Sequence, residues 1–347
     1  MGKSLPAKTP KALLVCVGVL AGFILLLLSA ELTIRLCIHV LHGAPGKSYG
    51  INQPDPELGA VHRPNSYNTN SLINNWGFRN SEDIRQEKPA GSTRIYCSGG
   101  STTFCYNLLT EEAWPSVLQA KLRKITGHER DEVLNAGEIC FSVSQEFTLA
   151  KRFVPQLKPD VVILMTGINE WLSARTLEKE NTDFDRLLRE EKWGVFSRNL
   201  DQGRFLKRNS ALVRFVEYRV LPFLQSRSQD AFRQQERPSW FHLHPWVVKN
   251  FDHTLRDYIA FLKANGCKVV VIRYGDNGDT GWYSKVLRFF RDQATDIGRD
   301  EGAVICDLAS LAERHPNRKD LYVESGFHVT REGAQVVADE ILRVLLN

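Results

Sequence analysis

The sequence predicts a three-layer α/β/α sandwich with a central parallel sheet. Apolar runs of strand length alternate with amphipathic helical stretches from residue 94 onward. Two of these runs, Val161–Met165 and Val269–Ile272, are apolar without interruption, as expected of parallel strands that are covered on both faces. The length of 347 residues is enough for one large domain or two small ones with a core that needs no disulfide staples. We therefore expect an α/β domain over residues 91–347.

The individual elements follow from the same periodicity. Strands are predicted at 94–98, 132–136, 161–166, 268–273 and 303–307. Helices are predicted between them at about 111–126, 144–157, 250–265 and 284–301, with a last helix at 331–346. The alternation of strands and helices is interrupted at about 171–249, a segment that we interpret as a helical insertion ending in a Pro/Trp/His-rich stretch.

The N-terminal segment has the pattern of a membrane anchor. Residues 12–30 carry no charge and approach the ~20 apolar residues that cross a bilayer. The competing reading is a cleavable signal peptide, but Leu28 stands where a cleavage site has a small residue. The lysines of residues 1–11 predict a cytoplasmic N-terminus and an extracytoplasmic catalytic domain, which is periplasmic in a Gram-negative cell. Residues 31–90 are predicted to form a stalk and an irregular, Gly/Pro/Asn-rich lead-in.

Composition excludes several classes of function. Lys and Arg number 45 against 40 Asp and Glu, and this surplus is spread along the chain, so no nucleic-acid partner is expected. The seven cysteines form no C-x-x-C pair, which argues against a zinc module and a disulfide framework. His242 and His244 lack a third ligand, and the loop 275–281 lacks the spacing of a calcium site. We expect no metal and no cofactor, and we interpret 275–281 as part of an active-site rim.

Polar residues and glycines gather where the predicted strands end. Because ligands bind outside the carboxyl ends of parallel strands, these residues are expected to converge at one edge of the sheet. They comprise a serine, a glycine and an asparagine that follow three strands, and a histidine that precedes the last helix: Ser101, Gly137, Asn169 and His328. A hydroxyl nucleophile, a base and amide donors are what acyl transfer requires.

In this order, Gly99-Gly100-Ser101-Thr102-Thr103, Asn135-Ala136-Gly137, Thr166-Gly167-Ile168-Asn169 and Gly326-Phe327-His328 resemble the blocks of the SGNH, or GDSL-like, hydrolase superfamily. With Asn75-Trp76-Gly77-Phe78-Arg79, they are similar to its membrane-anchored bacterial branch, and the resemblance covers roughly 73–346. It implies a flavodoxin-like SGNH hydrolase fold. It also implies Ser101 as nucleophile, His328 as general base, and an oxyanion hole made of the Ser101 and Gly137 backbone N–H groups and the Asn169 amide.

Two positions depart from the family pattern. Gly100 replaces the usual Asp before the serine, and Ser325 stands where the triad Asp is expected, three residues before the histidine. Three alternatives remain for the group that orients His328: the neighbouring Glu324, Asp276 in the loop after the fourth strand, or a Ser–His dyad steadied by a backbone carbonyl. An acid that fixes the imidazole tautomer is worth up to ~10⁴ in rate.

The sequence therefore predicts a membrane-anchored serine esterase or deacylase, or an acyl(acetyl)transferase, that acts on ester-linked acyl groups of envelope glycans or lipids. The alternative function is a non-catalytic glycan- or partner-binding protein that keeps the fold and has lost the acid. A third hypothesis is that 171–249 docks an envelope protein partner. Cys105 and Cys140 closely follow two of the blocks, so they either form a disulfide or remain two free thiols.

Overall fold

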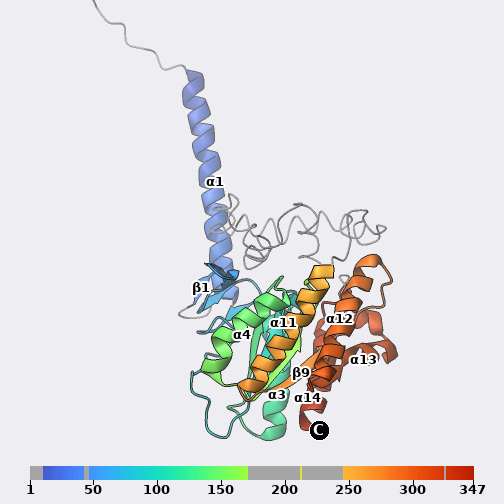
Figure 1. Cartoon of the computed structure of the whole chain (residues 1–347). Coiled ribbons are helices and arrows are strands. Elements are labelled where there is room, and N and C mark those ends of the chain that lie inside the picture. The colour runs from blue at the N-terminus through green and yellow to red at the C-terminus, as the bar shows by residue number, and fades with distance from the viewer. Residues whose placement is uncertain (1–10, 43–46, 171–211, 213–244, 324–325) are drawn as a thin grey trace, which may run out of the picture.

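A computed structural model describes residues 11–42, 47–170, 212, 245–323 and 326–347. Its centre is a sheet of five parallel strands in the order β10-β9-β8-β6-β7, which confirms the predicted fold class (Figure 1). The strands are β6 (Arg94–Gly99), β7 (Glu132–Gly137), β8 (Val161–Met165), β9 (Lys268–Arg273) and β10 (Val304–Asp307). Numbered from β6 onward, this order is the flavodoxin-like 2-1-3-4-5, whose switch point lies between the carboxyl ends of β6 and β8.

Helices cover both faces of the sheet because successive strand residues point to opposite sides. In β8, Ile163 and Met165 belong to one apolar cluster, whereas Val162 and Leu164 belong to the other. The first cluster is completed by α3 (Trp114–Thr126), α13 (Leu308–Arg314) and α14 (Arg331–Leu346). The second is completed by α4 (Val143–Leu157), α11 (Pro245–Ala264) and α12 (Trp282–Asp300). The core is thus split into two layers by a sheet that is apolar on both faces.

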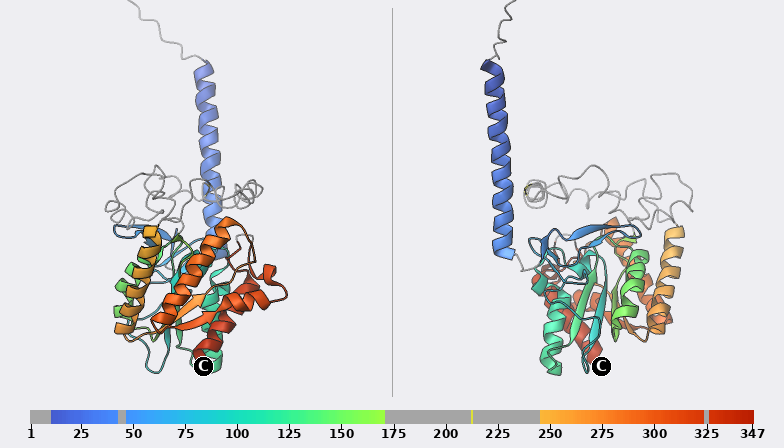
Figure 2. Two further views of the ribbon diagram at one scale, coloured as in Figure 1. Left: turned by 45° about the vertical axis from the view of Figure 1, so that its right-hand side comes forward. Right: turned by 90° about the vertical axis from the view of Figure 1, so that its left-hand side faces the viewer.

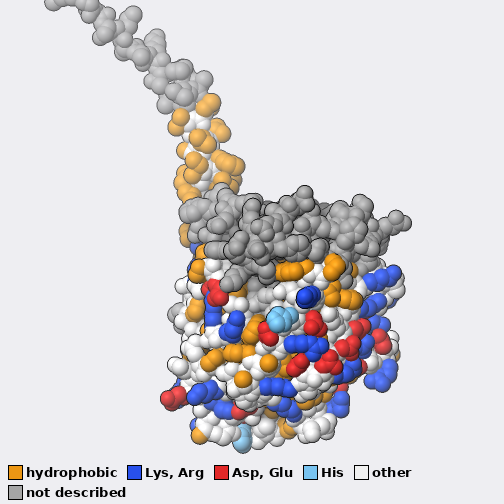
Figure 3. Space-filling view, viewed as in Figure 1, with side chains coloured by type: hydrophobic (Ala, Val, Ile, Leu, Met, Phe, Trp, Pro, Cys, Tyr) orange, Lys and Arg blue, Asp and Glu red, His pale blue; other side chains and the backbone are white. Residues whose placement is uncertain are grey.

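The N-terminal helix α1 (Lys11–His42) is longer than the predicted span. Its stretch Val15–Cys37 is long and apolar enough to cross a membrane, with a mean hydropathy of 2.4 and no part buried in the structure. On the face shown in Figure 3, the side chains of this stretch are hydrophobic, whereas Lys/Arg and Asp/Glu side chains are interspersed over the domain. Glu31 and Arg35, which end the uncharged run, form an ion pair of 2.7 Å one turn apart, which lowers the cost of carrying two charges in an apolar helix.

The lead-in is more regular than predicted. The hairpin of β2 (Asn52–Asp55) and β3 (Gly59–His62) and a small sheet of β1 (Ser48–Tyr49), β4 (Ser66–Tyr67) and β5 (Leu72–Ile73) precede the main domain. Strands of two to four residues are too short to produce a periodic pattern, so the sequence shows only their turns. Residues 171–211 and 213–244 lie outside the described residues, as do most of the predicted insertion, His242 and His244.

The carboxyl ends of the strands and α1 lie at the same end of the domain. Helix α14 starts beside this end and runs to the C-terminus, which both views of Figure 2 place opposite α1. Helix α11 likewise starts at the end of the domain from which α1 extends and runs toward the opposite end (Figure 1). The edge of the sheet that carries the predicted site residues therefore faces the direction in which α1 extends.

Candidate active site

Ser101 is the first residue of a four-residue helix, α2 (Ser101–Phe104), which begins directly after β6. Gly99 has a φ of 155°, and a Cβ there would lie 2.2 Å from Thr103 Oγ1 and 2.6 Å from the Met165 carbonyl oxygen. Only glycine fits a turn this tight. A residue at the start of a helix has no intrahelical acceptor for its N–H, so the Ser101 backbone N–H is available as a donor beside its own hydroxyl.

His328 reaches Ser101 from the other end of the chain. The Ser101 Oγ and His328 Nε2 atoms are 2.8 Å apart, and the two residues are only 8% and 7% exposed. The histidine sits in a turn closed by hydrogen bonds from the Val323 N–H to the His328 carbonyl and from the Gly326 N–H to the Val323 carbonyl. The Thr330 side chain accepts a hydrogen bond from the Gly333 N–H and so caps α14.

Asn169 follows β8 and lies against the glycine that precedes the nucleophile. Its Nδ2 donates to the Phe141 carbonyl at 2.9 Å, and a Cβ on Gly100 would lie 2.4 Å from that nitrogen. A side-chain amide has two N–H donors, so one remains for a ligand at Ser101. The glycine in place of the usual Asp thus leaves the space that the Asn169 amide fills.

Gly137 holds a packing position. Its N–H donates to Asn135 Oδ1 at 3.1 Å, a hydrogen bond that competes with the predicted role in the oxyanion hole. A Cβ on Gly137 would lie 2.3 Å from the Phe104 nitrogen, so glycine is required for α2 to pack on β7. Cys140, three residues on, has a φ of 67°, and its N–H has no hydrogen-bond partner among the described residues. Cys140 precedes Phe141, whose carbonyl accepts the Asn169 hydrogen bond, so Cys140 is a second candidate for the backbone donor beside Gly137.

Of the residues considered for orienting His328, Glu324 lies outside the described residues, as does Ser325 at the expected position of the triad Asp. Asp276 is committed elsewhere: its carboxylate pairs with Arg288 at 2.9 Å, Arg291 at 3.4 Å and Arg318 at 2.5 Å. Burial raises the pKa of Asp276, but the Arg288 hydrogen bond and the arginine charges outweigh it, so the pKa lies below its ordinary value. The loop does border the histidine turn, because the Asn277 N–H donates to the Gly326 carbonyl at 2.8 Å.

A buried arginine, not identified from the sequence as functional, binds the C-terminal end of α2, the helix that begins at Ser101. Arg79 donates to the carbonyl oxygens of Phe104 and Cys105, where α2 ends, and its guanidinium lies 4.6 Å from the Phe104 ring centroid. It also binds the carbonyls of Asn70 and Leu108. Burial lowers the pKa of Arg79 to about 10, so the side chain stays charged at neutral pH. A cation at a helix C-terminus is stabilising, which explains how so short a helix is held.

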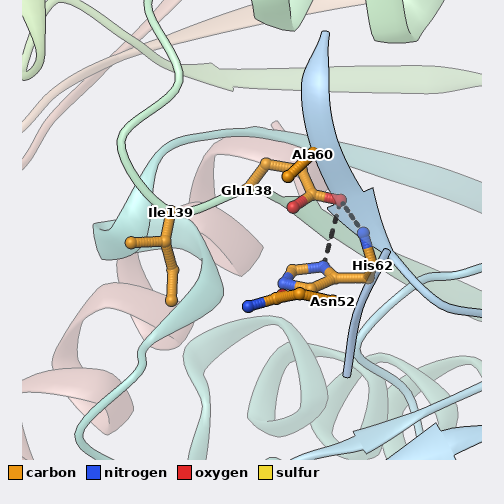
Figure 4. A pocket seen from close by; sticks show the side chains of 5 residues that line it. All are labelled: Asn52, Ala60, His62, Glu138 and Ile139. Atoms are coloured by element: carbon orange, nitrogen blue, oxygen red, sulfur yellow. Dashed lines mark hydrogen bonds and ion pairs between the residues drawn. The ribbon is translucent and has the colours of Figure 1, made fainter. Parts of the chain in front are cut away.

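Two more buried groups fix the loops around the site. Glu138 Oε1 accepts from the His62 backbone N–H at 2.9 Å and lies 3.1 Å from His62 Nδ1, in a small pocket lined by the β2–β3 hairpin and the loop after β7 (Figure 4). Glu170, next to Asn169, accepts from the Val143 N–H at the start of α4. Burial and the nearby Glu170 charge raise the pKa of Glu146 well above its usual range. No sequence motif marks these pairs, because their members lie far apart in the chain.

The cysteines near the site carry free thiols. Burial raises the pKa of both Cys105 and Cys140 to about 11, so neither is a thiolate at neutral pH and neither competes with Ser101 as nucleophile. The predicted alternative of a disulfide between them is not present. Among the described residues, no group of three His, Cys, Asp or Glu side chains is placed to hold a metal ion.

The family model described as GDSL-like lipase/acylhydrolase matches residues 97–336, which include Ser101, Asn169 and His328. The chain belongs to the GDSL-like lipase/acylhydrolase family. Membership in the GDSL-like family implies esterase or acylhydrolase activity. No curated protein matches the sequence.

Solved structures with a similar fold are distant in sequence. A lipolytic protein of the G-D-S-L family from Desulfitobacterium hafniense DCB-2 is 13% identical, with a TM-score of 0.44 over 73% of this chain and 99% of the other. A lipase/acylhydrolase from Enterococcus faecalis is 15% identical, with a TM-score of 0.44 over 73% and 94%. The acetylxylan esterase Axe2 from Geobacillus stearothermophilus is 14% identical, with a TM-score of 0.45 over 74% and 95%.

Proposed function

We propose that this chain is a membrane-anchored serine esterase or acyltransferase that works through an acyl-enzyme on Ser101. The observation that carries the proposal is the 2.8 Å contact between Ser101 Oγ and His328 Nε2, made between residues 227 positions apart. A hydroxyl within hydrogen-bond reach of an imidazole is the arrangement of an activated nucleophile. The substrate class is an acyl ester of an envelope glycan or lipid, and α1 serves as the anchor.

The first half of the reaction forms the acyl-enzyme. His328 Nε2 accepts the Ser101 proton while Oγ attacks the ester carbonyl, so the proton of this ring must sit on Nδ1 beforehand. The carbonyl oxygen gains negative charge and takes hydrogen bonds from the Ser101 N–H, the second Asn169 amide N–H and the Cys140 N–H. Collapse of this intermediate expels the alcohol, which receives the proton from His328.

The second half returns the enzyme to its starting state. Water, or the hydroxyl of an acceptor sugar, gives its proton to His328 and attacks the acyl-enzyme, and Ser101 leaves with that proton. Hydrolysis and transfer differ only in which hydroxyl attacks. Both use the same four residues of this chain: Ser101, His328, Asn169 and Cys140.

The proposal is tested by labelling the full chain with a fluorophosphonate, which reacts only with an activated serine. Ser101→Ala abolishes labelling and removes hydrolysis of a short-chain ester such as 4-nitrophenyl acetate. Ser116→Ala serves as the matched control, because Ser116 is a partly exposed serine on α3, away from the strand ends, and this variant keeps both activities. Folded wild-type protein that remains unlabelled would instead favour the non-catalytic binding function.

A further inference from the structure

The apolar part of α1 touches the domain directly. Ile34 lies inside the stretch Val15–Cys37 and packs against Tyr67 of the small sheet β1-β4-β5, as does Leu72 of the same sheet. The helix continues only to His42, so at 1.5 Å per residue it extends about 7 Å beyond that stretch. If α1 spans a bilayer, the small sheet therefore lies at the membrane surface, and no long stalk separates the domain from it.

A short series of contacts connects this sheet with the catalytic histidine. The Leu72 N–H donates to Thr110 Oγ1 at 2.8 Å, and Asn70 Nδ2 donates to the Tyr106 carbonyl at 2.5 Å. The Tyr106 ring then packs edge-on against the His328 ring, with centroids 4.7 Å apart. Each link is formed by described residues, so the position of the active site relative to α1 is set by packing.

Aromatic side chains at the edge of the site agree with a position at the membrane surface. Tyr106 is 43% exposed beside a histidine that is itself buried, and tyrosine is enriched at membrane–water interfaces because its ring is apolar and its hydroxyl polar. Phe327, partly buried, also contacts His328, with ring centroids 4.5 Å apart. The carboxyl ends of the strands also face the direction of α1 (Figures 1 and 2).

From these observations we infer that the substrate is a lipid: an acyl ester carried in the headgroup region of the same membrane that α1 spans, and not a soluble glycan. The inference rests on the proposed function and narrows its substrate class. A domain of this size is about 45 Å across. An active site at its far end would need an ester on a long tether, whereas a site at the membrane end reaches an ester close to the lipid surface.

The experiment measures how hydrolysis depends on tether length. Full-length protein is reconstituted in phosphatidylcholine vesicles that contain a 7-butyryloxycoumarin ester linked to the amine of dioleoylphosphatidylethanolamine. The spacer is either short, about 10 Å, or long, about 60 Å, to bracket the domain diameter. Free 7-butyryloxycoumarin is the soluble reference.

We expect the short-spacer lipid to be hydrolysed at least as fast as the long-spacer lipid. A short-spacer rate about tenfold or more below the long-spacer rate would overturn the inference while leaving the proposed function intact. Loss of hydrolysis on all three esters would instead overturn the proposed function, and the inference with it. The two failures are thus distinguishable.

A pair of insertions tests whether α1 sets the position of the active site relative to the membrane. Twenty Gly/Ser residues placed between His42 and Ser48 add a flexible reach of about 25 Å, and should lower the short-spacer rate roughly fivefold while soluble-ester hydrolysis is unchanged. The matched control places the same insertion between Glu129 and Arg130, two exposed residues at the opposite end of the domain, and should leave all rates unchanged. Equal short-spacer rates in the two insertion variants would contradict a position fixed by α1.

Discussion

Gly100→Ala is the substitution that most directly tests how the oxyanion hole is built. The new methyl group would lie 2.4 Å from Asn169 Nδ2, and real Cβ atoms essentially never approach closer than 3.0 Å. The amide must therefore move by at least about 0.6 Å. Gly100 has a φ of −87°, outside the left-handed region, so the substitution acts by steric contact and not through strain in φ.

The size of the effect follows from what the amide does. A displacement of this order weakens the 2.9 Å hydrogen bond to the Phe141 carbonyl and misaligns the free N–H. A misplacement of about 1 Å at a reacting centre costs on the order of 10²-fold in rate, and removal of one oxyanion donor costs about 10²–10³-fold. We expect Gly100→Ala to lower kcat by roughly 10- to 100-fold, and Asn169→Ala by roughly 10²–10³-fold.

The assay is kcat for 4-nitrophenyl acetate in the two single variants and the double variant, with thermal unfolding measured on each. If Gly100→Ala acts through Asn169, the double variant should be no slower than Asn169→Ala alone, within about twofold. Full activity in Gly100→Ala would refute the steric argument. Multiplied losses in the double variant would refute the assignment of the effect to Asn169.

Substitutions at three other positions test groups around the site. Asp276→Asn should lower the free energy of unfolding by about 3 kcal/mol, because three arginines lose their partner. Since the pKa of Asp276 is lowered, its contribution to the free energy of unfolding is fully present above the ordinary value of 3.8 and is lost as the pH falls through the folded-state pKa. Urea unfolding of Asp276→Asn should therefore lack this part of the loss of stability at acid pH. Glu146→Gln should become more stable relative to wild type as pH rises above 4.5, by up to about 1.4 kcal/mol per pH unit, because the folded wild type keeps a proton that the unfolded chain releases. Cys140→Gly should keep kcat within about twofold and raise stability by up to about 1 kcal/mol, since the φ of 67° suits glycine, whereas Cys140→Val should lower both in the same assays.

The strands were predictable because burial on both faces leaves runs rich in apolar residues, which are uninterrupted in Val161–Met165 and Val269–Ile272. The prediction of 94–98 against the observed Arg94–Gly99 is typical of the agreement. Helix α11 starts at Pro245, five residues before its predicted start, because proline reads as a loop residue although it suits the first turn of a helix. The predicted anchor stopped at residue 30 because Glu31 and Arg35 appear as two charges, and only the structure shows them paired.

The residues of the candidate site likewise divide into those that the sequence indicates and those that only the structure shows. Ser101, Asn169 and His328 could be proposed from the sequence because they are polar residues that follow strand ends or precede a helix, and the structure places Ser101 Oγ 2.8 Å from His328 Nε2. The backbone donor was harder: the family resemblance implies Gly137, whose N–H the structure pairs with Asn135 Oδ1, whereas Cys140 has a positive φ and an N–H without a partner among the described residues. The His62–Glu138 pair joins residues 76 positions apart, and no local pattern reports such a contact.

The four carbonyls held by Arg79 bear on where the smallest folding unit begins. The family match starts at residue 97 and the predicted domain at 91, yet a protein cut at either point would lack this guanidinium. The carbonyls at the end of α2 would then lose a buried charged donor, at a cost of about 1.5–3 kcal/mol for each charge-assisted hydrogen bond. A soluble version made for crystallisation or enzymology should therefore keep everything from the small sheet onward, because Arg79 of the lead-in holds the helix that begins at Ser101.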